Sequence, residues 1–96
     1  MAYNISVSAR AKKEIENAID YYALYSAEAP RNFTAALKRA LLALESSPLL
    51  PIRYKNIRAL KINKFPYSLY FVVNPTANSV KILACFHNKR NPNKRP

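Results

Sequence analysis

His87 and Arg90 stand three residues apart, where an apolar segment of the chain gives way to a basic one. His87 is the only histidine, and imidazole is the side chain whose ordinary pKa lies nearest neutrality. A nuclease that cuts RNA without a metal needs a base for the 2′-hydroxyl, cations for the charge that builds on the phosphate, and an acid for the leaving oxygen. We therefore take His87, Arg90, Arg58 and Lys61 as catalytic candidates, with Tyr67 as a possible acid. A lone histidine at a strand end is also often a surface or capping residue, so a structural role stays open.

The positive charge is concentrated in the second half of the chain. The net charge is +11 over 96 residues, yet all five acidic residues lie in residues 1–45, whereas residues 46–96 hold ten cations and no acid. Five of these cations occur in "RYKNIRALKINK", residues 53–64. Like charges at this density repel one another unless water or an anion screens them. The pattern favours a nucleic acid or an acidic protein as partner, with a merely solvated surface as the other interpretation.

Aromatic residues are interleaved with these cations, in "RYKNIR" and "KFPYSLY". Tyrosine rings beside cations can stack on the bases of a single-stranded nucleic acid, and they can equally pack in a core. The candidate residues for contact with a nucleic acid or an acidic partner are Arg53, Tyr54, Lys55, Lys64, Tyr67 and Lys89.

Composition excludes several classes of site. The chain has no glycine, on which phosphate-binding loops and dinucleotide folds depend. One histidine and one cysteine give no metal-ligand spacing and no internal disulfide, so we expect neither a metal nor another cofactor. Cys85, within "VKILACFH", is interpreted as a small buried hydrophobe. No apolar run approaches a membrane span and no secretory signal is evident, so we expect a cytoplasmic protein.

Hydrophobic periodicity predicts one α+β domain over residues 1–96, with residues 88–96 a basic tail. The predicted elements are a strand over residues 3–7, helices over 9–25 and 30–45, and strands over 57–63, 67–74 and 80–87. The order β-α-α-β-β-β places a helical hairpin on one face of a small, mainly antiparallel sheet and leaves the other face open. The long apolar runs in 69–73 and 82–86 predict that the last two strands are central, with Leu69, Phe71, Val73 and Phe86 facing inward.

In this order, the segments "IRALKINKFPYSLYFVV" and "ILACFHNKRNP" make the chain resemble the RelE/ParE superfamily of type II toxins, from Tyr3 to about Pro92. The resemblance implies the β-α-α-β-β-β fold. It also implies a toxin encoded beside an antitoxin, whose acidic or amphipathic segment wraps and neutralises the basic toxin.

The superfamily has two kinds of target, and the resemblance leaves both open. RelE-like members cut messenger RNA on the ribosome, and their basic site residues match Arg58, Lys61 or Lys64 here, plus Arg90 or His87. RelE-like enzymes often add a C-terminal tyrosine, and other members pair a glutamate with a histidine. This chain has no tyrosine after Tyr70 and no glutamate in its basic half. ParE-like members inhibit DNA gyrase, and the ending "HNKRNP" is similar to theirs. The sequence thus favours a ParE-like gyrase inhibitor, with a ribosome-dependent mRNA endoribonuclease as the alternative and a small non-toxic RNA-binding module as a third reading.

Overall fold

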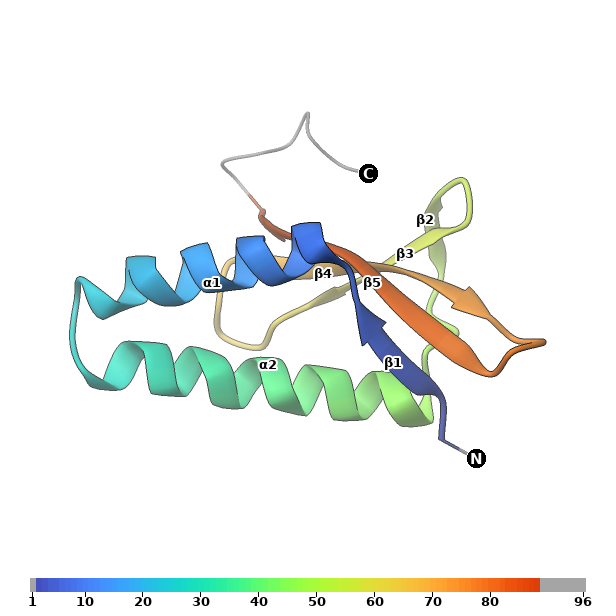
Figure 1. Ribbon diagram of the computed structural model, residues 1–96, viewed down its shortest axis with the longest axis horizontal. Coiled ribbons are helices and arrows are strands. Elements are labelled where there is room, and N and C mark those ends of the chain that lie inside the picture. Colours follow the sequence, from blue (N-terminus) through green and yellow to red (C-terminus); the bar gives the residue numbers. More distant parts are fainter. Residues whose placement is uncertain (1, 89–96) are drawn as a thin grey trace.

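The computed structural model describes residues 2–88, which fold into one five-stranded sheet with two helices (Figure 1). The strands are β1 (Asn4–Val7), β2 (Ile52–Tyr54), β3 (Ile57–Lys61), β4 (Tyr67–Asn74) and β5 (Ser79–His87), and the helices are α1 (Ala9–Ala23) and α2 (Glu28–Ser46). The sheet order is β1-β5-β4-β3-β2, in which only the β1–β5 pair is parallel. The predicted α+β architecture is confirmed, and β4 lies at the centre of the sheet with β5 beside it.

Local chemistry sets the ends of the two helices. The Ser8 hydroxyl accepts a hydrogen bond from the Ala11 amide at 3.0 Å and so caps α1. The helix ends at Ala23 and not at the predicted Tyr25. The amides of the next two residues, Leu24 and Tyr25, donate to carbonyls three residues earlier in the chain, which forms a tighter turn than that of an α-helix. At the start of α2, the Ser26 hydroxyl accepts from the Ala29 amide at 3.0 Å, and Pro30 follows within the first turn, where its missing N–H costs nothing.

The sequence pattern missed β2, a three-residue strand that pairs with β3 at the sheet edge. All of its side chains are exposed, so no alternation of apolar and polar residues marks it. It is joined to β3 through Lys55 and Asn56, and Lys55 has a positive φ of 55°. In a chain without glycine, Lys55, Lys64 and Asn78 supply the left-handed backbone that tight turns need.

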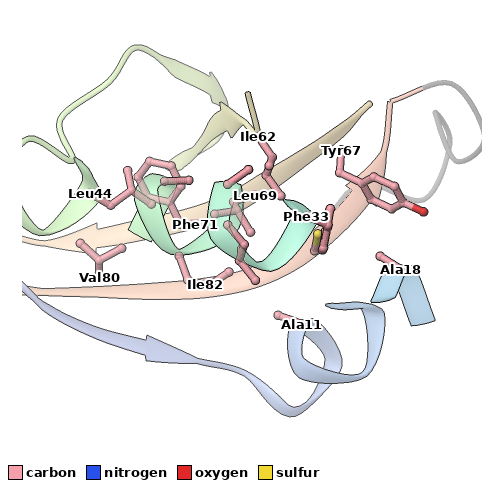
Figure 2. Packing of buried hydrophobic residues seen from close by; sticks show 14 residues of the cluster. Ala11, Ala18, Phe33, Leu44, Ile62, Tyr67, Leu69, Phe71, Val80 and Ile82 are labelled. Atoms are coloured by element: carbon pink, nitrogen blue, oxygen red, sulfur yellow. The ribbon is translucent and has the colours of Figure 1, made fainter. Parts of the chain in front are cut away.

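The core lies between the helices and one face of the sheet, which we call the helix face (Figure 2). Phe33 of α2 is fully buried, and its ring packs on Phe65 and Tyr67, with centroids 5.2 and 5.5 Å away. Tyr22 of α1 stacks on Phe33 at 5.4 Å, so one aromatic cluster joins both helices to the sheet. Leu69, like Phe33, is completely buried. Aromatic pairs at these separations add to the stability gained from burial alone.

One predicted core residue lies on the other side of the sheet. Leu69 and Phe71 join the main core as predicted, and Val73 packs against it, but Phe86 pairs with Ser68 and not with Leu69. A register shift between Tyr70 and Phe71 changes which residues of β5 face the helices. Phe86 is nevertheless only 4% exposed, because the Tyr70 ring and the Arg10 guanidinium lie against it, at 5.6 and 4.8 Å.

The first turns of α1 cover the edge of β5 beyond the point where β1 ends. β1 pairs with residues 79–82 of β5. Further along, the Ser8 hydroxyl donates to the Leu83 carbonyl at 3.0 Å and Glu14 Oε1 accepts from the Cys85 amide at 2.9 Å. The side chains of the α1 N-cap, Ser8, and of Glu14 in the helix therefore replace hydrogen bonds that a longer β1 would make, which leaves this edge less open to another strand.

We expect the Glu14→Ala substitution to lower the free energy of unfolding by about 1–3 kcal/mol, because it leaves the Cys85 amide without its acceptor. Glu14→Gln keeps a side-chain oxygen at this position and is expected to cost less than about 1 kcal/mol. Urea denaturation measures both, with the exposed Glu16→Ala as the matched control, expected within about 0.5 kcal/mol of wild type. Equal losses for Glu14→Ala and Glu16→Ala would contradict this role of Glu14.

Candidate functional site

The sheet face opposite the helices carries side chains that alternate with those of the core, and we call it the open face. Residues paired across the strands share a face, so the register assigns Lys61, Ser68 and Phe86 to one row and Val72 and Lys81 to another. Lys61 and Lys81 are both exposed there, and β2 to β5 contain no acidic residue. The open face is therefore the positively charged face of the sheet.

Arg58 and Lys61, two catalytic candidates on one strand, point to opposite sides of the sheet. They are three residues apart in β3, and an odd spacing in a strand reverses the face. Arg58 pairs with the core residue Phe71, and its Nε donates to the Leu50 carbonyl at 2.6 Å. Its half-buried guanidinium thus ties the loop before β2 to the sheet, a structural role that the sequence pattern did not indicate.

His87 ends β5 on the helix face. It lies two residues beyond Cys85 and pairs with Tyr67, and the two rings meet edge to face with centroids 5.1 Å apart. Tyr67 is 6% exposed and packs on Phe33, so its ring lies in the core and is not available for stacking on a base. The structure brings His87 and Tyr67 together as predicted candidates, but it separates both from Lys61 by the thickness of the sheet.

The other predicted binding residues that the structure describes are exposed in β2 and in two turns of the sheet. Arg53, Tyr54 and Lys55 occupy the β2–β3 hairpin, and Lys64 lies in the turn between β3 and β4. All four are exposed, Tyr54 to 55%, and the Lys55 ammonium lies 5.3 Å from the centre of the Tyr54 ring. The predicted residues Lys89 and Arg90, and the tail from 89 onward, lie outside the described residues.

Lys81 is a candidate that sequence reasoning missed. It stands beside a shallow hollow of about 500 Å³ between β1, β4, β5 and the β2–β3 hairpin. The hollow is lined by Ser6, Asn56, Val72, Val73, Asn74, Pro75, Ser79 and Lys81. One cation among neutral amides and hydroxyls suits an anionic group such as a carboxylate. A signal was present in the sequence, because in "VKIL" the lysine alone interrupts an apolar run. The face of the sheet on which Lys81 lies, however, follows from the pairing of β5 with β4.

Cys85 is not a nucleophile in this arrangement. The thiol is buried, and desolvation raises its pKa to about 12, with a further contribution from the Glu14 carboxylate. No group of three or more histidine, cysteine or acidic side chains that could hold a metal occurs in residues 2–88. Within the same described part, no helix is long and apolar enough to cross a membrane.

The arrangement of this chain is similar to that of solved toxin–antitoxin proteins. A chain of the chromosomal ParDE system of P. aeruginosa superposes with a TM-score of 0.76 at 14% identity, covering 90% of this chain and 96% of that one. A chain of the intact E. coli RelBE complex superposes with a TM-score of 0.67 at 19% identity, covering 93% of this chain and 100% of that one. A chain of the RelBE2 complex of Mycobacterium tuberculosis superposes with a TM-score of 0.66 at 18% identity, covering 91% of this chain and 99% of that one. At these identities the likeness shows a shared fold.

The amino-acid sequence identifies the family to which the chain belongs. Residues 5–92 match the family described as the ParE toxin of the type II toxin–antitoxin system parDE. The chain therefore belongs to the ParE toxin family, and the resemblance predicted from its sequence is confirmed. Comparison with curated proteins gives no match.

We expect iodoacetamide to alkylate native Cys85 at pH 8 at least about a hundredfold more slowly than in denaturant. The raised pKa lowers the thiolate fraction roughly a thousandfold, and burial hinders access as well. Mass spectrometry of timed samples measures the rate, and Cys85→Ala, which removes the only thiol, is the control. Rapid labelling of the folded protein would contradict the buried, protonated thiol.

Proposed function

We propose that this chain inhibits bacterial growth by binding DNA gyrase, and that an antitoxin with an acidic or amphipathic segment neutralises it. The observation that carries the proposal is the match to the ParE toxin family over residues 5–92, nearly the whole chain. The likeness to a chain of a ParDE system, at a TM-score of 0.76, supports the same choice.

The placement of the candidate residues supports inhibition by binding over cleavage of RNA. A general base and the cations that stabilise a phosphate must reach the same phosphodiester. Lys61 stands on the open face, His87 on the helix face, and Arg58 is engaged by the Leu50 carbonyl. A binding inhibitor has no such requirement, because an extended charged surface suffices.

Charge supports an acidic partner for the open face. Lys61 and Lys81 are exposed on it, and the Lys81 hollow offers neutral hydrogen-bonding groups around one cation. The structures that this fold resembles are toxin–antitoxin complexes. We infer that carboxylates of the antitoxin neutralise this face, which lowers the repulsion among its cations.

A ribosome-dependent mRNA endoribonuclease is the second candidate. It is favoured by the likeness to chains of RelBE complexes and by the exposed Lys61 on a basic sheet face. In that case Lys61 and His87 are the described residues to examine first.

Induction of the chain alone in a bacterial host separates the two candidates. We expect growth arrest with broken DNA held in gyrase complexes and with messenger RNA intact. Gyrase that is bound by this chain and cannot rejoin the cut DNA strands leaves breaks in the DNA. The measurements are recovery of gyrase-linked DNA and mapping of RNA ends in the same cells. Cuts at codon positions without DNA breaks would overturn gyrase inhibition in favour of the endoribonuclease.

The His87→Ala substitution gives a second test that separates gyrase inhibition from RNA cleavage. Gyrase inhibition without catalysis predicts that the variant keeps growth inhibition within about threefold of wild type, provided that it stays folded. A catalytic base predicts a loss of about a hundredfold or more. Thermal unfolding of the purified variant reports whether the Tyr67–His87 contact has weakened the fold.

A further inference from the structure

The open face of the sheet is filled by large side chains at one end and hollowed at the other. At the filled end, the rings of Tyr70 and Phe86 pack together with their centroids 5.6 Å apart. Beyond the register shift that follows Tyr70, the row that contains Lys81 has Ser6 on one side and Val72 on the other. These two side chains are smaller than the rings, and the hollow of about 500 Å³ lies beside them.

The charge of Lys81 is not balanced by another side chain in the described part of the chain. β2 to β5 contain no acidic residue, and the ion pair of Arg10 with Glu14 lies on α1. Within residues 2–88, the Lys81 ammonium takes part in no hydrogen bond or ion pair. This exposed ammonium can therefore bind an anionic partner without first giving up a contact inside the protein.

Neutral groups around the hollow can also donate to an anion. Asn74 Oδ1 already accepts from the Ala77 amide at 3.1 Å, so the hydrogens of Asn74 Nδ2 remain for another acceptor. Ser6, Ser79 and Asn56, whose side chains are donors as well, line the same hollow. One cation with several neutral donors around it suits a carboxylate, which accepts charge-assisted hydrogen bonds at both oxygens.

The spacing of the cations favours an acidic protein over a nucleic acid as the occupant. Lys61 pairs with Ser68 and Lys81 with Val72, four residues apart on β4, and the two lysines belong to the strands on either side of β4. Strand geometry puts their Cα atoms roughly 16 Å apart, a length over which one strand of a DNA duplex carries about five phosphates. Two lysines match few of these charges. An acidic peptide can instead place single carboxylates among apolar residues, which suits the Val72 and Pro75 side of the hollow.

We propose that the hollow is a docking site for one acidic side chain of a partner protein, with the carboxylate on the Lys81 ammonium and an adjoining apolar residue on Val72 and Pro75. The inference rests on the proposed function in naming the partner, which is the antitoxin. The competing role is that of a solvated surface lysine, which attracts an acidic peptide no better than the exposed Lys38 of α2 does.

A short peptide tests the site on the purified full chain, without gyrase or antitoxin. The probe is an acetylated and amidated pentapeptide with one glutamate between two valines, and the comparison peptide has glutamine in place of the glutamate. We expect the glutamate peptide to shift the amide resonances of Ser6, Ser79 and Lys81 saturably in nuclear magnetic resonance titrations, and the glutamine peptide to bind about fivefold more weakly. No saturable shift up to about 10 mM peptide, or equal binding of both peptides, would overturn the site.

Substitutions of Lys81 assign the binding to its charge. Lys81→Met removes the charge from a side chain of similar length and is expected to weaken the glutamate peptide about fivefold, whereas Lys81→Arg keeps the charge and is expected to stay within about twofold of wild type. Lys38→Met, on a helix that covers the other face, is the matched control and is expected to bind as wild type does. Wild-type binding by Lys81→Met, or an equal loss in Lys38→Met, would contradict the proposal. Thermal unfolding checks that each variant is folded.

A pentathymidylate in the same titration tests a nucleic acid as the occupant. Tighter binding of this oligonucleotide than of the glutamate peptide, lost in Lys81→Met, would overturn the acidic protein partner. The proposed function is tested separately, by gyrase-linked DNA breaks. If the chain inhibits neither growth nor gyrase while the glutamate peptide binds at Lys81, the proposed function fails and the docking site stands with another acidic partner.

Discussion

Burial of the Phe33 ring against the helix face is the contact on which the rest of the structure depends. The ring is fully buried and meets Tyr22 from α1, Phe65 from the β3–β4 turn and Tyr67 from β4, so a single side chain joins both helices to the sheet. A chain of 96 residues buries a limited core, and aromatic side chains supply much of its apolar area. Because the core occupies one face, every second residue of each strand must face the other side.

That constraint distributes the charge of the molecule. Half of the residues of β3, β4 and β5 are committed to the core, and the cations of alternate positions, Lys61 and Lys81, stand on the open face. Arg58 falls on the helix-face positions and is accommodated at the margin of the core by its bond to the Leu50 carbonyl. The same alternation that makes the open face basic therefore separates the residues that a nuclease would have to bring together. It is a geometry suited to binding an anionic surface.

Much of the fold could be predicted because its signals are local. The helices follow from apolar residues at three- and four-residue spacing with Ser8 and Pro30 near their starts, and β4 and β5 from long apolar runs. The edge strand β2 has no such signal, since its pairing with β3 is a tertiary contact between exposed residues. The residue types of the candidate site were also predictable, but their faces were not. The register shift between Tyr70 and Phe71 places Phe86 opposite the core, and no pattern within β5 marks that shift. The place of Lys81 beside the hollow depends on pairings between distant segments in the same way.

The central claim is that this ParE-family chain acts as a binding surface and not as a ribonuclease. The most direct measurement adds the purified chain to purified gyrase with supercoiled plasmid and, in parallel, to ribosomes translating a defined messenger RNA. The account predicts linear plasmid trapped by gyrase in proportion to the added chain, with the RNA left whole. RNA cut at the ribosome while gyrase supercoils the plasmid normally would contradict it.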